Sequence, residues 1–226
     1  KSYNSMGRYN VLVKASFRPL ERNRVAIKVD IDEGTLTRID NISINGLTKF
    51  TESDLLGIMD LKATNILSWW EKDDRYSKST LSADLEKIKS FYMDRGYLNF
   101  EIVSTDVSIT PNKKRLTITI DVDEGDKYTF GDVSISGSIN EFSEIDLKSN
   151  ITVKKDKVFS SKEVNLSSSN LSNYLGNFGY AFANINPISK IDEKNKQVSY
   201  DFFVDTGNKV YVRNINFIGN TRTKDK

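Results

Sequence analysis

The chain has 226 residues and a net charge of +2, is 38% hydrophobic and 28% charged, and contains neither cysteine nor histidine. This composition is typical of one or two folded domains. It excludes thiol chemistry, disulfides, zinc bound by the usual ligands and acid–base catalysis by histidine. The small net charge argues against nucleic acid or an anionic membrane surface as a partner, and we expect the fragment to be soluble.

The chain opens with a predicted β-hairpin. Residues 11–13 begin its first strand, and a turn is expected through Pro19 to Asn23. In the second strand the apolar residues alternate at Val25, Ile27, Val29 and Ile31. A period of two is typical of a strand with one buried face.

Three markers recur along the chain and indicate internal repeats. An acidic strand end closes on Gly34, Gly125 and Gly207, a strand ends at Gly46, Gly137 and Gly219, and a helix end precedes a strand at Gly7, Gly96 and Gly179. The first two markers have the same two spacings. We therefore expect residues 1–34 to end one repeat, 35–125 and 126–207 to be complete repeats, and 208–226 to hold the first strand of another, within a longer protein.

The first complete repeat is predicted to run β-α-α-β-β. A strand over residues 38–44 precedes a short helix that Thr51 caps and that ends near Met59. A second helix is expected from about Ser77 to Asp94, with Gly96 as its C′ residue. The apolar stripe of that helix is Leu81, Leu85, Ile88 and Tyr92.

A second hairpin closes this repeat. Its first strand is expected over residues 99–109 and its second over residues 116–122, where Leu116, Ile118, Ile120 and Val122 share one face. The apolar positions of the first strand change phase, which predicts a bulge or a twist between Val103 and Asp106.

The second complete repeat follows the same order. We expect a strand over residues 132–135, a short helix over 143–151, a longer helix that starts with a capping box of Ser160 and Glu163, and hairpin strands from Phe182 and near Val198. The stripe of the longer helix is Val164, Leu171, Tyr174 and Phe178, and Gly179 ends the helix.

Several stretches resemble POTRA (polypeptide-transport-associated) repeats, in particular those of the periplasmic arm of the BamA family of outer-membrane assembly factors. They include Asp84-Leu85-Glu86, residues 92–97 and 110–114, Glu124-Gly125, Gly179-Tyr180-Ala181 and Tyr211-Val212-Arg213. The resemblance covers the whole chain, from about the second repeat to the fifth. It implies an α+β class of tandem domains, each a three-stranded mixed sheet under two antiparallel helices, with the last strand in the centre.

The resemblance also implies a function. It indicates a scaffold without enzymatic activity or cofactor, on the periplasmic face of the outer membrane of a Gram-negative bacterium. The implied partners are unfolded outer-membrane protein precursors, accessory lipoproteins and periplasmic chaperones, and the full protein would carry a membrane β-barrel. Binding would use β-augmentation, in which main-chain hydrogen bonds hold a partner strand at an open sheet edge.

The first hairpin strand of the first complete repeat is the candidate edge. Its residues are Asn99, Phe100, Glu101, Ile102, Val103, Ser104, Thr105, Asp106 and Val107. The corresponding strand of the second repeat carries Pro187, which removes a backbone donor, whereas the first repeat has no proline before Pro111. Because a bulge can also protect an edge, both a binding edge and an ordinary edge stay open as interpretations.

Trp69 and Trp70 also have two interpretations. They could anchor a partner, since tryptophan is common in binding hot spots, or cap the core of their own repeat. We favour the cap for at least one of them.

The same residues bear on other possible functions. The strand-end carboxylates Asp121, Asp123 and Glu124 could indicate a metal site or a catalytic pair, but their recurrence favours a structural strand terminus. Two alternatives remain: the POTRA arm of a related autotransporter-assembly or two-partner secretion transporter, and an RNA-binding βααβ module, which would need a basic face.

Overall fold

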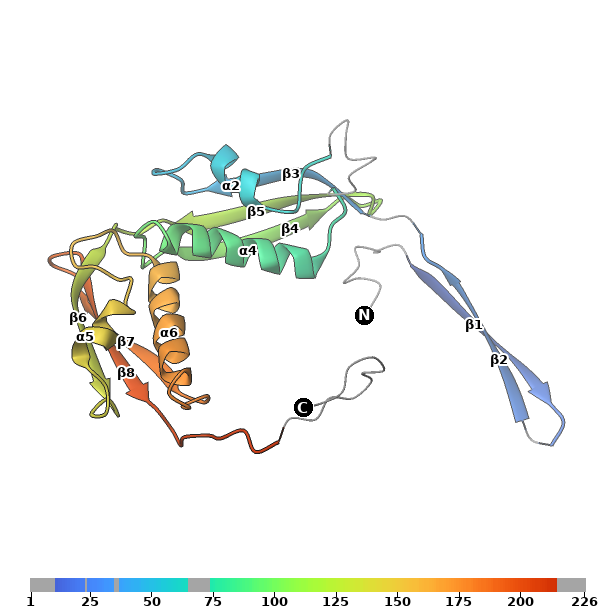
Figure 1. Cartoon of the computed structure of the whole chain (residues 1–226). Coiled ribbons are helices and arrows are strands. Elements are labelled where there is room, and N and C mark those ends of the chain that lie inside the picture. The colour runs from blue at the N-terminus through green and yellow to red at the C-terminus, as the bar shows by residue number, and fades with distance from the viewer. Residues whose placement is uncertain (1–10, 23, 35–36, 65–73, 215–226) are drawn as a thin grey trace, which may run out of the picture. The chain divides into compact units, whose positions relative to one another are not determined.

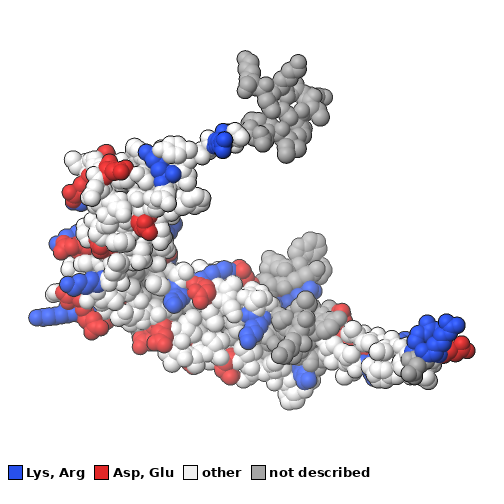
Figure 2. Space-filling view, turned by 90° about the horizontal axis from the view of Figure 1, so that it is seen from below, with Lys and Arg blue, Asp and Glu red and all other residues white. Residues whose placement is uncertain are grey.

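The computed structural model describes residues 11–22, 24–34, 37–64 and 74–214. The chain divides into a first unit, Lys1–Asp126, and a second unit, Lys127–Lys226, and each is described by itself. Within the described ranges, no helix has both the length and the apolar character required to cross a membrane. Figure 2 shows charges of both signs interspersed over the face in view.

The N-terminal hairpin consists of β1 (Leu12–Leu20) and β2 (Arg24–Asp32), which pair antiparallel. The prediction that its turn begins at Pro19 was wrong, because Pro19 lies within β1 opposite Val25. A proline is tolerated there because β1 is an edge strand.

The first unit also holds a three-stranded sheet. It comprises β3 (Arg38–Asn45), β4 (Glu101–Ile109) and β5 (Arg115–Asp123) in the order β3-β5-β4. Strand β5 is central, parallel to β3 and antiparallel to β4. The central place of the last strand is what the sequence resemblance implied.

Two described helices accompany this sheet, and Figure 1 shows the longer one lying along it. Helix α2 (Glu52–Ile58) begins with a capping box between Thr51 and Asp54, and Ser77 caps α4 (Lys78–Met93). The predicted stripe packs into the core, with Leu85 partly buried at its margin. The fully buried residues of this core include Ile39, Leu55, Ile88, Tyr92, Ile118 and Ile120.

The second unit repeats the arrangement. Its elements are β6 (Thr129–Gly137), α5 (Glu144–Ser149), α6 (Ser161–Gly176), β7 (Asn184–Asp192) and β8 (Gln197–Asp205), and the sheet order is β6-β8-β7. Ser160 caps α6 by accepting a hydrogen bond from the Glu163 N–H. Each unit is therefore α+β with a mixed sheet.

Three predictions for the second unit are corrected. Phe178 is not part of the helix stripe: α6 ends at Gly176, Phe178 is 46% exposed, and Leu175 fills the core instead. Strand β7 begins two residues after the exposed Phe182, and β6 extends beyond both ends of the predicted strand. The strand expected in residues 208–226 leads to Gly219, and residues 215–226 lie outside the described residues.

The structure explains two of the repeated glycine markers. At the acidic strand ends, an aspartate accepts a hydrogen bond from the N–H of the glycine two residues later, in the pairs Asp32–Gly34, Asp123–Gly125 and Asp205–Gly207. At Gly46 and Gly137, a Cβ atom would lie 2.1 Å from a carbonyl oxygen of the central strand. Close approach at the strand ends therefore requires glycine at both of these positions.

Candidate partner-binding edge

One edge of each three-stranded sheet is covered by the chain itself. In the first unit, the Ile39 N–H donates to the Asp74 carbonyl oxygen at 2.9 Å, and the Thr64 N–H donates to the Ile39 carbonyl oxygen at 2.8 Å. In the second unit, the Phe130 N–H donates to the Lys157 carbonyl oxygen at 2.8 Å. The first strands, β3 and β6, are thus covered at their N-terminal halves, and β4 and β7 form the opposite edges.

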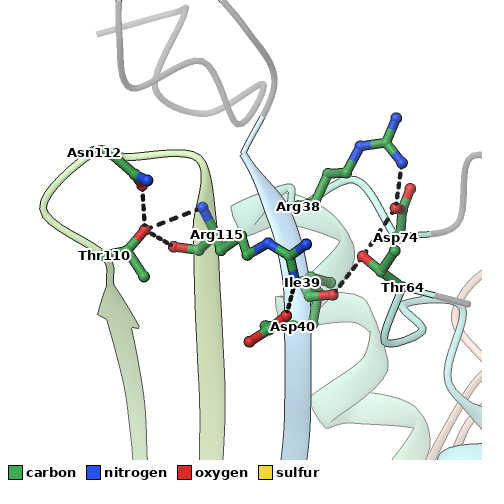
Figure 3. A network of polar contacts seen from close by, with 8 residues as sticks. All are labelled: Arg38, Ile39, Asp40, Thr64, Asp74, Thr110, Asn112 and Arg115. Carbon is green, nitrogen blue, oxygen red and sulfur yellow. Dashed lines mark hydrogen bonds and ion pairs between the residues drawn. The ribbon is translucent and has the colours of Figure 1, made fainter.

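Side chains reinforce this shield, as Figure 3 shows. The buried Asp74 carboxylate accepts hydrogen bonds from Arg38 at 3.1 Å and from the Thr64 hydroxyl at 3.0 Å. The Arg115 side chain pairs with Asp40 at the same end of the sheet. Residues 65–73, with Trp69 and Trp70, lie outside the described residues.

The backbone groups of β4 that face away from the sheet follow from its pairing with β5. The Thr110 N–H donates to the Arg115 carbonyl oxygen at 3.0 Å. Since hydrogen-bonded and non-hydrogen-bonded pairs alternate in an antiparallel ladder, even-numbered residues of β4 from Ser104 onward face β5. Thr105, Val107 and Ile109 therefore direct their N–H and C=O groups away from β5.

The predicted irregularity is present at the start of this edge. The register between β4 and β5 shifts between Ile102 and Ser104, which makes Val103 the extra residue of a bulge. Val103 is 64% exposed. The stretch from Ser104 to Ile109 stays regular, so the bulge leaves most of the edge suited to pairing.

The observed edge strand starts later than the sequence predicted. Asn99 and Phe100 precede β4, which begins at Glu101. Phe100 is only 5% exposed and stacks on Tyr92 with 4.0 Å between ring centroids, so it belongs to the core. Phe100 is apolar because it packs under α4, and it does not lie on the edge strand.

The side chains of β4 add little protection against pairing. No lysine or arginine lies between Glu101 and Ile109, although lysine is a common guard of edge strands. On the face away from the core, Asp121 accepts hydrogen bonds from the Ser104 hydroxyl at 2.5 Å and from the Asn45 side chain at 2.9 Å. These bonds, first that of Ser104 and then that of Asn45, hold the pKa of Asp121 below its usual value.

The matching edge of the second unit has a different character. The Val204 carbonyl oxygen accepts from the Ser138 N–H at 2.8 Å, so even-numbered residues of β8 face β6 and odd-numbered ones face β7. Pro187, opposite Phe202, therefore points its ring nitrogen outward. An outward donor is missing from β7 at the place where β4 has Thr105 opposite Ile120.

Two further buried carboxylates, besides Asp74, stabilise the first unit. Asp84 on α4 is fully buried and accepts from the N–H groups of Asp60 and Leu61, each at 2.9 Å. In the second unit, the Ser167 hydroxyl accepts from the N–H groups of Thr152 and Val153 in the same way. No role was predicted for Asp84, although its place as an acidic residue within an apolar helix stripe indicates a buried carboxylate.

Glu124 is the other buried carboxylate. It accepts from the Thr48 N–H at 2.7 Å, the Thr48 hydroxyl at 2.5 Å, the Lys49 N–H at 2.9 Å and the Tyr92 hydroxyl at 2.8 Å. Burial raises the pKa of Glu124, but the bonds from Thr48, Tyr92 and Lys49 outweigh burial and lower it overall. These contacts give Glu124 the structural role predicted for the strand terminus. In the described residues, no group of three acidic side chains is placed to hold a metal ion.

The chain matches known proteins, and the family matches coincide with its two complete repeats. The family model described as "POTRA: Surface antigen variable number repeat" matches residues 37–125 and 128–207. The chain is 30% identical over its whole length to the outer membrane protein assembly factor BamA of Neisseria meningitidis, and 28% identical over 91% of its length to that of Buchnera aphidicola. It spans 28% and 33% of those two proteins.

A solved structure gives the same fold. The crystal structure of Haemophilus influenzae BamA POTRA3-5 matches with a TM-score of 0.67 at 24% identity, over 83% of this chain and 73% of that one. With the family model covering most of the residues, the chain belongs to the POTRA family.

Proposed function

We propose that this chain is part of the periplasmic scaffold of an outer-membrane protein assembly factor, and that β4 binds partner strands by β-augmentation. Its partners would be unfolded outer-membrane protein precursors and accessory lipoproteins, with periplasmic chaperones as a further class. Residues 1–34 and 208–226 would be parts of neighbouring repeats, and 35–125 and 126–207 complete ones. The names of the relatives support the assembly role.

One observation carries the choice of β4. Thr105, Val107 and Ile109 direct backbone donors and acceptors away from the sheet, while the equivalent strand β7 lacks a donor at Pro187. Main-chain hydrogen bonds depend little on the partner's sequence, so this mode of binding suits precursors that share only strand-forming segments. No covalent step is required for this function.

Thr105→Pro tests the proposal. The variant removes one outward N–H and copies the residue found in β7, so the fold should tolerate it. We expect at least about fivefold weaker binding of a fluorescent peptide with alternating apolar and polar residues, because one hydrogen bond is worth about 1 kcal/mol. Fluorescence anisotropy measures the affinity.

A control variant makes the test specific. Thr105→Val keeps the outward N–H and should bind like the parent chain. Ser104→Pro is unsuitable, since the Ser104 N–H faces β5 and its loss would damage the sheet. Unchanged peptide affinity in folded Thr105→Pro would contradict a binding role for β4.

A further inference from the structure

The second unit contains a small polar hollow at the end of its sheet. It is lined by Ser138, Asn140, Glu141, Phe142, Tyr180 and Thr206, and its volume is about 220 Å³. Pockets for whole small molecules usually measure about 300–1,000 Å³, so this hollow fits a single side chain better.

Phe142 and Tyr180 form an aromatic wall on one side of the hollow. Phe142 contacts the ring of Tyr180 edge-on with 5.7 Å between centroids, and it contacts Phe178 in the same way at 5.5 Å. The Tyr180 hydroxyl donates to one carboxylate oxygen of Glu141 at 2.7 Å. That bond orients the carboxylate, and Glu141 forms no ion pair with any described residue.

The first unit has a hollow at the equivalent place, lined in part by Thr48, Lys49 and Glu124. There, Glu124 stands at the strand-end position that Thr206 has in the second unit, and its carboxylate accepts hydrogen bonds from Thr48 and Lys49 in the loop after β3 and from Tyr92 on α4. Thr206 is too short to make those contacts. The carboxylate of the second unit comes instead from the loop after β6 and lines the hollow.

In the first unit, the corresponding aromatic residues contact an arginine of the same chain. The Arg95 guanidinium carbon lies 3.6 Å from the ring centroid of Phe91, which itself contacts Phe50. Phe178 occupies the corresponding position after α6, so the second unit supplies no arginine of its own there. Lys209 lies with its Nζ 5.5 Å from the Tyr180 ring centroid, a distance within the range of cation–π contacts.

We propose that this hollow binds the guanidinium of an arginine side chain from a partner polypeptide. The guanidinium would pair with the Glu141 carboxylate and lie against the aromatic wall, while Ser138, Asn140 and Thr206 offer further hydrogen-bond acceptors. A planar, weakly hydrated cation with several donors matches this combination better than the compact ammonium of lysine. The site is separate from β4 and does not depend on strand pairing there.

Titration of the full 226-residue chain with N-acetyl-arginine amide tests this site. The backbone amides of Asn140, Glu141, Phe142 and Thr206 should show saturable shifts in ¹H–¹⁵N spectra. N-acetyl-citrulline amide, which has nearly the same shape without the charge, should bind about five- to tenfold more weakly, since charge-assisted hydrogen bonds are roughly twice as strong as neutral ones.

Glu141→Gln should weaken arginine binding by a similar factor and leave the fold intact, because Glu141 is exposed. Glu144→Gln is the matched control: it makes the same charge change at an exposed residue of α5 that is paired with Lys148 outside the hollow. Equal binding of arginine and citrulline, or equal losses in the two variants, would overturn the proposal. So would shifts confined to residues outside the hollow.

Discussion

Replacing Asp84 by alanine is expected to lower the free energy of unfolding of the first unit by about 3 kcal/mol. Asp84 is fully buried and accepts the N–H groups of Asp60 and Leu61, so its loss leaves both donors without this acceptor. Lys87 also loses one of its two carboxylate partners and keeps only Asp60. Hydrogen–deuterium exchange of peptides from each unit separates the loss in the first unit from any change in the second.

The second unit supplies the matched variants. Asp84→Ser introduces the residue found at the equivalent position, Ser167. The Ser167 hydroxyl accepts hydrogen bonds from the N–H groups of Thr152 and Val153, which correspond to Asp60 and Leu61. It should therefore cost clearly less than Asp84→Ala. Ser167→Ala should destabilise only the second unit, by about 1–2 kcal/mol. Similar exchange rates in Asp84→Ala and the parent chain would show that the two N–H groups find other acceptors.

Local patterns predicted the elements of these units because their causes are local. The alternation of Leu116, Ile118 and Ile120 is set by the strand period, and the caps at Thr51 and Ser77 act within one helical turn. The errors have a different origin. Whether Leu175 or Phe178 enters the core depends on where α6 ends, and both residues fit the helical spacing.

The candidate edge was predictable in part for the same reason. A proline in one strand and none in the other can be seen in the sequence, and so can the change of phase at the bulge. Which backbone groups face outward depends on the pairing of β4 with β5, and this pairing joins residues far apart in the chain. The register therefore identifies Thr105, and not its neighbour Ser104, as a residue whose N–H faces away from β5.

Glu124→Gln is the second substitution with a large expected effect, about 2 kcal/mol of destabilisation of the first unit at pH 7. A glutamine places an NH₂ group among donors from Thr48, Lys49 and Tyr92, so hydrogen bonds are lost without any loss of volume. These contacts tie the end of β5 to α4, which packs beside β4. Tyr92→Phe removes one of the donors and should cost less than Glu124→Gln.

The pH dependence of stability tests whether the negative charge of Glu124 causes the stabilisation. The folded-state pKa of Glu124 is lowered, so its stabilising contribution is fully present above the unfolded value of about 4.3 and is lost as the pH falls through the folded value. The stability difference between the parent chain and Glu124→Gln should therefore be constant from pH 7 to about 5 and shrink in more acidic solution. Denaturant unfolding followed by unit-resolved hydrogen exchange measures this difference. A difference that grows on acidification would mean that Glu124 is protonated in the folded protein and acts as a neutral hydrogen-bonding group.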